Sequence, residues 1–134
     1  MPKDVLKEVL AKVKKDKVAY VDLLFSDFLG NVKSSTIPVY NLEGALSRGV
    51  WIDGSSIEGY ARIHESDMYL MPDTQTYALL PWRNHEQGGR VARFICDVYN
   101  PNHEPFEGDP RYILKKALKE AKVLEYEYFT GPEC

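Results

Sequence analysis

Two short segments of the chain contain residues whose types and spacing could do chemistry. Asp53-Gly54-Ser55-Ser56 puts an acid at the head of a polar turn, where Asx-type hydrogen bonds can hold the carboxylate rigidly while it stays exposed. Gly131-Pro132-Glu133 puts a second carboxylate near the last residue. A fixed carboxylate can bind a small cation or accept a proton, and glutamate oxygens are ligands that Mg²⁺ or Mn²⁺ can use.

Both segments also have a purely structural interpretation, and the residues alone favour it. Asp53 can serve only to form the turn, and Glu133 can be a solvated surface side chain. One carboxylate cannot hold a metal ion, and no second acid lies beside Glu133 in the sequence. The sequence also lacks histidines at metal-ligand spacing, a phosphate-binding glycine loop, a dinucleotide fingerprint and a nucleophile with a histidine partner.

Composition places the chain among ordinary globular domains. It has 134 residues, of which 44% are hydrophobic and 28% charged, which suits one domain with a real core. A net charge of -3 gives no electrostatic footprint for nucleic acid, and no apolar run approaches the ~20 residues that span a bilayer. Because the first residues also lack the apolar stretch of a signal peptide, we expect a cytoplasmic protein with no nucleic-acid or membrane partner. Cys96 lies in an apolar strand pattern and is expected to be a buried, reduced thiol.

Three helices are predicted around the two chemical segments. Apolar residues recur at helical spacing over residues 4–15, with Asp4 as the expected N-cap. A short helix is expected over residues 40–48. A third is expected over residues 110–122 and begins after Asp109, a second expected N-cap.

Strand patterns fill most of the remaining chain. The segments 67–71 and 76–80 are predicted to form a hairpin around Pro72-Asp73, and Trp51-Ile52 leads into the Asp53 turn. Strands alternating with inserted helices predict an α+β fold, with a mixed sheet covered by helices on one face. The other expected strands are 18–25, 31–37, 91–99 and 124–130.

A series of short motifs runs through the whole chain in a fixed order. Each is weak alone, but the ordered series is specific, and it resembles the N-terminal domain of type I glutamine synthetase. The segments 57–63 and 106–109 resemble the subgroup found in Gram-positive bacteria and archaea. The motifs are Val21-Asp22-Leu23 with Phe25, Asp27 and Gly30; Asp53-Gly54-Ser55-Ser56-Ile57; Glu65-Ser66-Asp67-Met68 with Met71-Pro72-Asp73; Leu80-Pro81-Trp82; Ala92-Arg93 with Cys96-Asp97-Val98-Tyr99; Pro105-Phe106 with Gly108-Asp109-Pro110-Arg111; and Gly131-Pro132-Glu133.

The resemblance implies a β-grasp-like domain over residues 1–134, including the helix at about 4–15. In that family the domain packs against the catalytic domain of a neighbouring subunit in a hexameric ring, and two rings stack into a dodecamer. The family joins glutamate and ammonium at the expense of ATP, through γ-glutamyl phosphate, with Mg²⁺ or Mn²⁺ ions.

The resemblance also implies roles for five residues. Asp53 matches the aspartate that binds ammonium and removes its proton, and Ser56 matches a serine of the same catalytic loop. Tyr60 matches an aromatic residue near the nucleotide of the adjacent subunit, and Arg62 an arginine used in feedback inhibition by glutamine. Glu133 matches the first glutamate of the metal-binding strand.

The chain departs from the family pattern at its end. It stops at Cys134, before the family's second glutamate and the catalytic domain. We therefore expect an inactive isolated chain that binds neither metal nor ATP by itself. Two other hypotheses are a stand-alone module that pairs with intact synthetase subunits, and a fragment of a related ligase that joins glutamate to other amines. The Asp53 loop, which suits ammonium, argues against the second.

Overall fold

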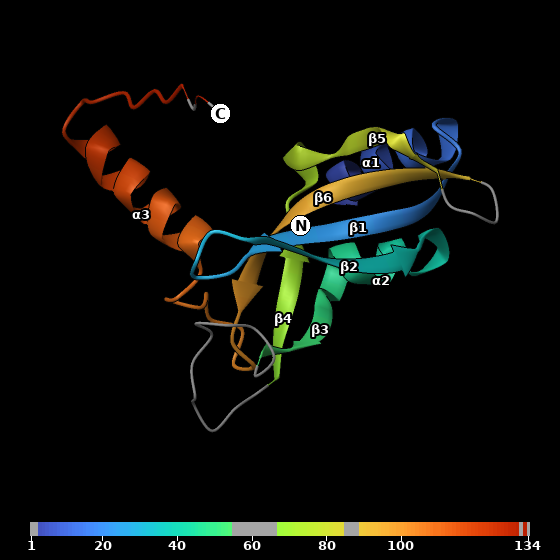
Figure 1. The fold of residues 1–134 in the computed structure, drawn as a ribbon, viewed down its shortest axis with the longest axis horizontal. Helices are drawn as coiled ribbons and strands as arrows, with labels where there is room; N and C mark the ends of the chain where they lie inside the picture. The colour runs from blue at the N-terminus through green and yellow to red at the C-terminus, as the bar shows by residue number, and fades with distance from the viewer. Residues whose placement is uncertain (1–2, 55–66, 85–88, 132, 134) are drawn as a thin grey trace.

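A mixed β-sheet forms the centre of the molecule (Figure 1). The computed structural model describes residues 3–54, 67–84, 89–131 and 133. Within these residues the strand order is β2-β1-β6-β4-β3, and β5 also pairs with β6. β1 and β6 are parallel, and the other strand pairs are antiparallel. The strands are β1 (Val18–Ser26), β2 (Val32–Pro38), β3 (Val50–Asp53), β4 (Asp67–Pro72), β5 (Ala78–Asn84) and β6 (Arg90–Tyr99).

The two parallel strands lie at the centre because their sequences are the most continuously apolar. β1 reads VAYVDLLFS, and its side chains are buried or half-buried throughout. β6 alternates between buried and half-buried positions along most of its length, and Phe94 is fully buried in the core. Cys96 is buried on the same strand as a free thiol, as predicted, and burial raises the pKa of that thiol above its usual range.

Two helices cover one face of the sheet. α1 (Lys3–Lys15) and α2 (Leu42–Arg48), which follows the 3-10 turn η1 (Val39–Asn41), both lie behind the sheet in Figure 1. Their apolar side chains enter the same hydrophobic cluster as the strands. The α+β fold, with a mixed sheet and helices on one face, is therefore confirmed. The helix residues buried in the cluster are Val9, Val13, Leu42, Ala45 and Leu46.

One predicted cap is wrong and another is confirmed. α1 already begins at Lys3, so Asp4 lies inside the first turn, where its charge faces the positive end of the helix dipole. In α3 (Pro110–Val123), Asp109 is the N-cap, as predicted, and its carboxylate accepts a hydrogen bond from the Arg111 backbone N–H.

The predicted hairpin between residues 67–71 and 76–80 is wrong. β4 and β5 run in the same direction along one edge of β6, β4 beside residues 96–99 and β5 beside residues 90–93. The 3-10 turn η3 (Thr74–Thr76) lies between them. Its Thr76 hydroxyl accepts a hydrogen bond from the Ile95 backbone N–H at 2.7 Å, and Asp73 N–H donates to the Ile95 carbonyl. These two bonds satisfy the backbone groups of Ile95 between β4 and β5. The chain therefore continues along β6 and does not fold back as a hairpin.

The strand predicted at residues 124–130 is also wrong. After α3 the chain makes a turn, with Glu125 at φ 61°, and continues without regular structure. A strand needs a partner for its backbone groups, and no described strand pairs with this segment. Its apolar side chains, such as Phe129 at 84% exposure, stay in solvent.

Candidate functional site

Asp53 is the last residue of β3 and is exposed. Residues 50–53 form a short strand that pairs with β4, and Ser55 and Ser56 of the turn predicted to begin at Asp53 lie outside the described residues. The register places Asp53 directly opposite Asp67, the first residue of β4. Side chains of directly paired residues lie on the same face of a sheet, so the two carboxylates are on one face at this end of the β3–β4 ladder.

An aromatic cluster fixes that register two residues further along. Trp51 is paired with Tyr69, and the two rings meet edge to face at a centroid distance of 5.4 Å. Tyr69 also stacks on Tyr99 of β6 at 5.5 Å, and its hydroxyl lies 2.5 Å from Nδ1 of His103. Burial, together with nearby Tyr99, raises the pKa of Tyr69. A slip of one residue would turn Tyr69 out of this cluster, so the position of Asp53 is strongly specified.

Gly49, immediately before β3, makes the close approach of that strand possible. Its φ of 78° is in the region that favours glycine. A Cβ at this position would lie 2.6 Å from the Tyr69 ring and 2.9 Å from the Leu70 carbonyl oxygen. The glycine therefore ends α2 and lets β3 turn directly onto β4.

Of the other predicted site residues, the structure describes only Glu133, and it does not bring Glu133 together with Asp53. Ser56, Tyr60 and Arg62 lie outside the described residues. Glu133 is exposed and follows the irregular segment after α3. Figure 1 places that segment beside α3, well away from the end of β3.

The described residues do not fit a metal ion. Among residues 3–54, 67–84, 89–131 and 133, no three His, Cys, Asp or Glu side chains converge as a metal site would require. Glu133 offers one carboxylate, whereas Mg²⁺ requires near-octahedral oxygen coordination. We derive no chemical step through a metal from this chain.

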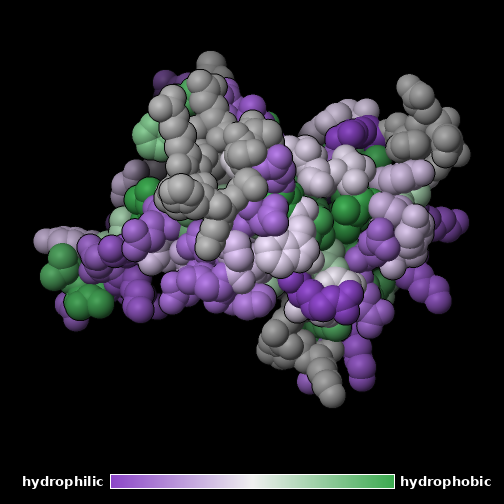
Figure 2. Space-filling view, turned by 90° about the horizontal axis from the view of Figure 1, so that it is seen from below, coloured by the Kyte–Doolittle hydropathy of each residue, from purple (hydrophilic) through white to green (hydrophobic). Residues whose placement is uncertain are grey.

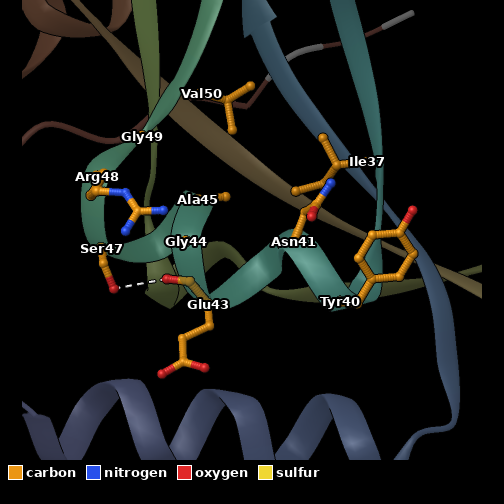
Figure 3. Close-up of a pocket in the computed structure, with 10 residues that line it drawn as sticks. All are labelled: Ile37, Tyr40, Asn41, Glu43, Gly44, Ala45, Ser47, Arg48, Gly49 and Val50. Atoms are coloured by element: carbon orange, nitrogen blue, oxygen red, sulfur yellow. Dashed lines mark hydrogen bonds between the residues drawn. The ribbon is translucent and has the colours of Figure 1, made fainter.

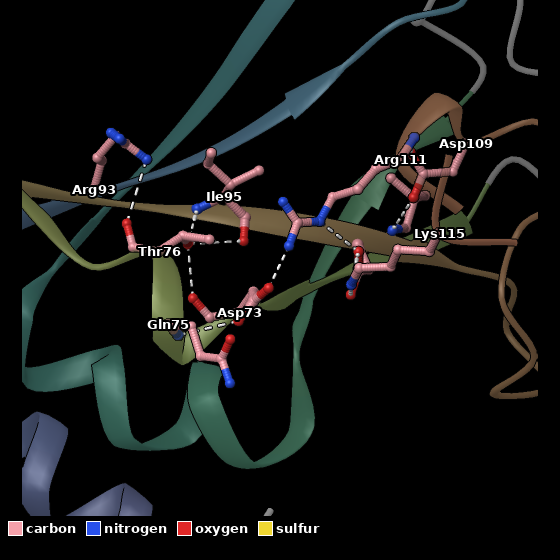
Figure 4. Close-up of polar contacts among 10 residues, drawn as sticks. Asp73, Gln75, Thr76, Arg93, Ile95, Asp109, Arg111 and Lys115 are labelled. Atoms are coloured by element: carbon pink, nitrogen blue, oxygen red, sulfur yellow. Dashed lines mark hydrogen bonds and ion pairs between the residues drawn. The ribbon is translucent and has the colours of Figure 1, made fainter. Parts of the chain in front are cut away.

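A cluster of charges joins the start of α3 to the sheet (Figure 4). The Arg111 guanidinium forms ion pairs with Asp73 after β4 and with Asp97 of β6. Lys115, one turn later, adds a second cation to Asp97 at 2.6 Å. The sequence predicted none of these contacts, because the three elements are far apart in the chain.

Asp109, the N-cap, anchors the same end of α3 to β6. Its side chain is 1% exposed, and it accepts backbone hydrogen bonds from Val98 at 3.1 Å and Arg111 at 3.0 Å. Burial raises the pKa of Asp109, and these two hydrogen bonds oppose the rise. No described residue of α3 is buried, so this anchor and the ion pairs carry the attachment of the helix.

Several apolar side chains of α3 and of the segment after it are exposed. Figure 2 shows apolar side chains at the end of the molecule where α3 and the following segment lie. These side chains are 40% to 84% exposed. They are Ile113, Leu114, Leu118, Val123, Leu124, Tyr126, Tyr128 and Phe129.

Comparison with known proteins gives the family. Residues 17–101 match the family described as "Glutamine synthetase, beta-Grasp domain". The chain is 46% identical over 134 residues to a glutamine synthetase of Clostridium saccharobutylicum, covering 100% of this chain and 30% of the relative. It is 48% identical over 126 residues to a glutamine synthetase of Methanosarcina mazei, covering 94% of this chain and 28% of the relative. The chain therefore belongs to the glutamine synthetase β-grasp domain family.

Solved structures share the fold at lower identity. A cryo-EM structure of Plasmodium falciparum glutamine synthetase matches 89% of this chain and 23% of its own, with a TM-score of 0.77 and 24% identity. The GmaS/ADP complex matches 87% of this chain and 26% of its own, with a TM-score of 0.76 and 21% identity. The chain spans less than a third of the length of the relatives it matches. Among the described helices, none is both long and apolar enough to cross a membrane.

Proposed function

We propose that this chain is the β-grasp part of a glutamine synthetase, a ligase that forms glutamine from glutamate, ammonia and ATP through γ-glutamyl phosphate. The observation that carries the proposal is the family membership together with the exposed carboxylate of Asp53 on a fixed strand end. The relatives bear the name glutamine synthetase, and the match runs through the whole of this chain.

In this proposal Asp53 works on the amine substrate. Its carboxylate binds ammonium and accepts a proton from it, which leaves ammonia with a free electron pair. Ammonia then attacks the γ-carbonyl carbon of γ-glutamyl phosphate. The C–N bond forms, the C–O bond to phosphate breaks, and the proton that the nitrogen loses leaves with the phosphate. Ser56 belongs to the same loop in the family and helps to hold the substrate. Asp67, directly opposite Asp53, adds negative charge beside the position of the cation.

The proposal requires protein beyond these 134 residues. The exposed apolar side chains of α3 support contact with further protein, and in the family the β-grasp domain serves the active site of a neighbouring subunit in a dodecamer. Mg²⁺ or Mn²⁺ and ATP would bind mainly to that catalytic domain, with Glu133 as one ligand, Tyr60 near the nucleotide and Arg62 in glutamine feedback. We propose a cytoplasmic enzyme, and an isolated chain without synthetase activity.

Steady-state kinetics of a longer protein that contains this domain test the proposal. In Asp53→Asn, glutamine formation should fall at least ~100-fold, the lower end of the range for loss of a general base, because the amide cannot accept the ammonium proton. Glu107→Gln is the matched control, since Glu107 is an exposed acid to which the proposal gives no role. Full activity in Asp53→Asn would refute the role of Asp53, and no ATP-dependent glutamine formation by the wild type would refute the proposed reaction.

A second candidate function is an assembly module that pairs with intact synthetase subunits. The exposed apolar residues of α3 and of the segment after it favour this function, because apolar side chains gathered at one end of a molecule are typical of protein interfaces. The 134-residue chain would then co-elute with a full-length relative and change its activity. Separate elution with unchanged activity would exclude it.

A further inference from the structure

A groove runs along α2 and is bounded by residues of β2 and β3 (Figure 3). Its volume is about 570 Å³, which lies within the range of small-molecule sites. It begins at the 3-10 turn η1 and ends where Gly49 leads into β3. The groove is therefore at the opposite end of β3 from Asp53, and the proposed synthetase reaction does not use it.

The Arg48 guanidinium is the cation of this groove. Figure 3 shows the side chain folded back along its own helix, over Gly44 and toward the groove. Gly44 leaves room for it, because a Cβ there would lie 3.1 Å from Nη2 of Arg48. In the described part of the chain Arg48 forms no ion pair and donates no hydrogen bond, so its donors are available to a ligand.

The other end of the groove supplies an aromatic face and an apolar floor. The Tyr40 ring is 82% exposed at the rim, and Asn41 lies beside it (Figure 3). Ile37 and Val50 line the floor from β2 and β3. An arginine at one end and an exposed ring at the other match a ligand that has an anionic group and a flat apolar body, because guanidinium groups bind carboxylate or phosphate in two-pronged geometry.

We propose that this groove binds a small organic anion in which a carboxylate or phosphate is joined to an aromatic body. The anionic group pairs with Arg48, and the aromatic body lies against Tyr40 over the floor of Ile37 and Val50. Glu43 also lines the groove, but its carboxylate points toward α1, away from Arg48 and Tyr40 (Figure 3).

Titration of the 134-residue chain with phenyl phosphate, followed by ¹H–¹⁵N NMR, tests the proposal. The resonances of residues 37–50 should shift, and phenyl phosphate should bind more tightly than either inorganic phosphate or benzyl alcohol. Arg48→Gln should weaken phenyl phosphate binding about tenfold, as expected for loss of a charge-assisted hydrogen bond. Tyr40→Ala should weaken it about threefold and leave inorganic phosphate unchanged, because only the ring contact is lost.

Two further variants keep the test independent of folding and of net charge. Lys119→Gln removes the same charge on α3, far from the groove, and should bind phenyl phosphate like the wild type. Gly44→Ala should raise the melting temperature, because alanine favours the helix, while its methyl group displaces the guanidinium and weakens binding. Equal affinity for phenyl phosphate and inorganic phosphate, or unchanged binding in Arg48→Gln, would overturn the proposal. So would shifts confined to other parts of the chain.

Discussion

The attachment of α3 through Asp109 yields the most sharply defined stability prediction. Asp109→Ala removes a buried carboxylate that accepts two backbone hydrogen bonds and caps the helix. Loss of an N-cap costs about 1 kcal/mol, and the buried Val98 N–H left without a partner costs a further 1–3 kcal/mol, roughly. We therefore expect the free energy of unfolding to fall by about 2–4 kcal/mol. Asp109→Asn should lower the free energy of unfolding nearly as much. The amide nitrogen of asparagine would face one of the two backbone N–H groups, and both of these are donors.

Urea unfolding followed by circular dichroism measures this loss, with Glu107→Ala as the control. Glu107 is an exposed carboxylate in the same loop, and its removal should change the free energy of unfolding by less than about 0.5 kcal/mol. A loss below about 1 kcal/mol in Asp109→Ala would refute the view that this carboxylate anchors α3.

The same residue gives a pH dependence with a defined sign. Burial raises the pKa of Asp109 in the folded chain above its ordinary value of 3.8. The folded state therefore holds the proton to higher pH than the unfolded state does, and stability falls as pH rises through that window. The stabilisation of the wild type relative to Asp109→Asn should be largest below pH 3.8 and should shrink as pH rises above it. A difference that grows with pH would contradict this assignment.

Two further changes test the β3 turn and the α3 ion pairs. Gly49→Ala should destabilise the chain by about 2–4 kcal/mol, through backbone strain and overpacking against Tyr69. Gly30→Ala is the control, because Gly30 has a φ of 85° and open space around it, so the change should cost only backbone strain of about 1–2 kcal/mol. If urea unfolding gave the same loss for Gly49→Ala and Gly30→Ala, the packing argument would be contradicted. Asp97→Asn should speed hydrogen exchange in α3 and cost roughly 1 kcal/mol, less in high salt because its ion pairs are partly exposed. Glu120→Gln on the same helix is the control, and exchange in α3 that matches the wild type would show that Asp97 does not hold the helix.

Local sequence signals predicted the parts of the fold that depend on local periodicity. The strands β1 and β6 were found because they are continuously apolar, and α3 because Asp109 and Pro110 mark its start. The pairing of β4 and β5 with β6 was not predicted. A Pro-Asp turn is compatible both with a hairpin and with a short interruption between two strands that lie along the same edge of β6. The strand at residues 124–130 was wrong, because an alternating apolar pattern does not supply a partner.

The candidate site was predictable only in part. Asp53 could be picked out from the polar residues that follow it. Its pairing with Asp67 could not be predicted, because strand register depends on contacts between residues fourteen positions apart in the sequence. The Tyr69–His103 hydrogen bond that helps to fix this register joins residues 34 positions apart and leaves no local pattern. The groove at Arg48 was missed for a similar reason, since it depends on how η1 and β3 enclose α2.

The central claim, that Asp53 serves the active site of a neighbouring subunit, has a direct test in mixed oligomers of the longer protein. Asp53→Asn and Glu133→Gln subunits, each inactive alone, are co-expressed and assembled together. If Asp53 acts across the interface and Glu133 within its own subunit, random assembly leaves about a quarter of the sites intact, so glutamine formation should return to about a quarter of the wild-type rate. If both residues serve the same subunit, no site is intact, and mixed oligomers without activity would contradict the claim.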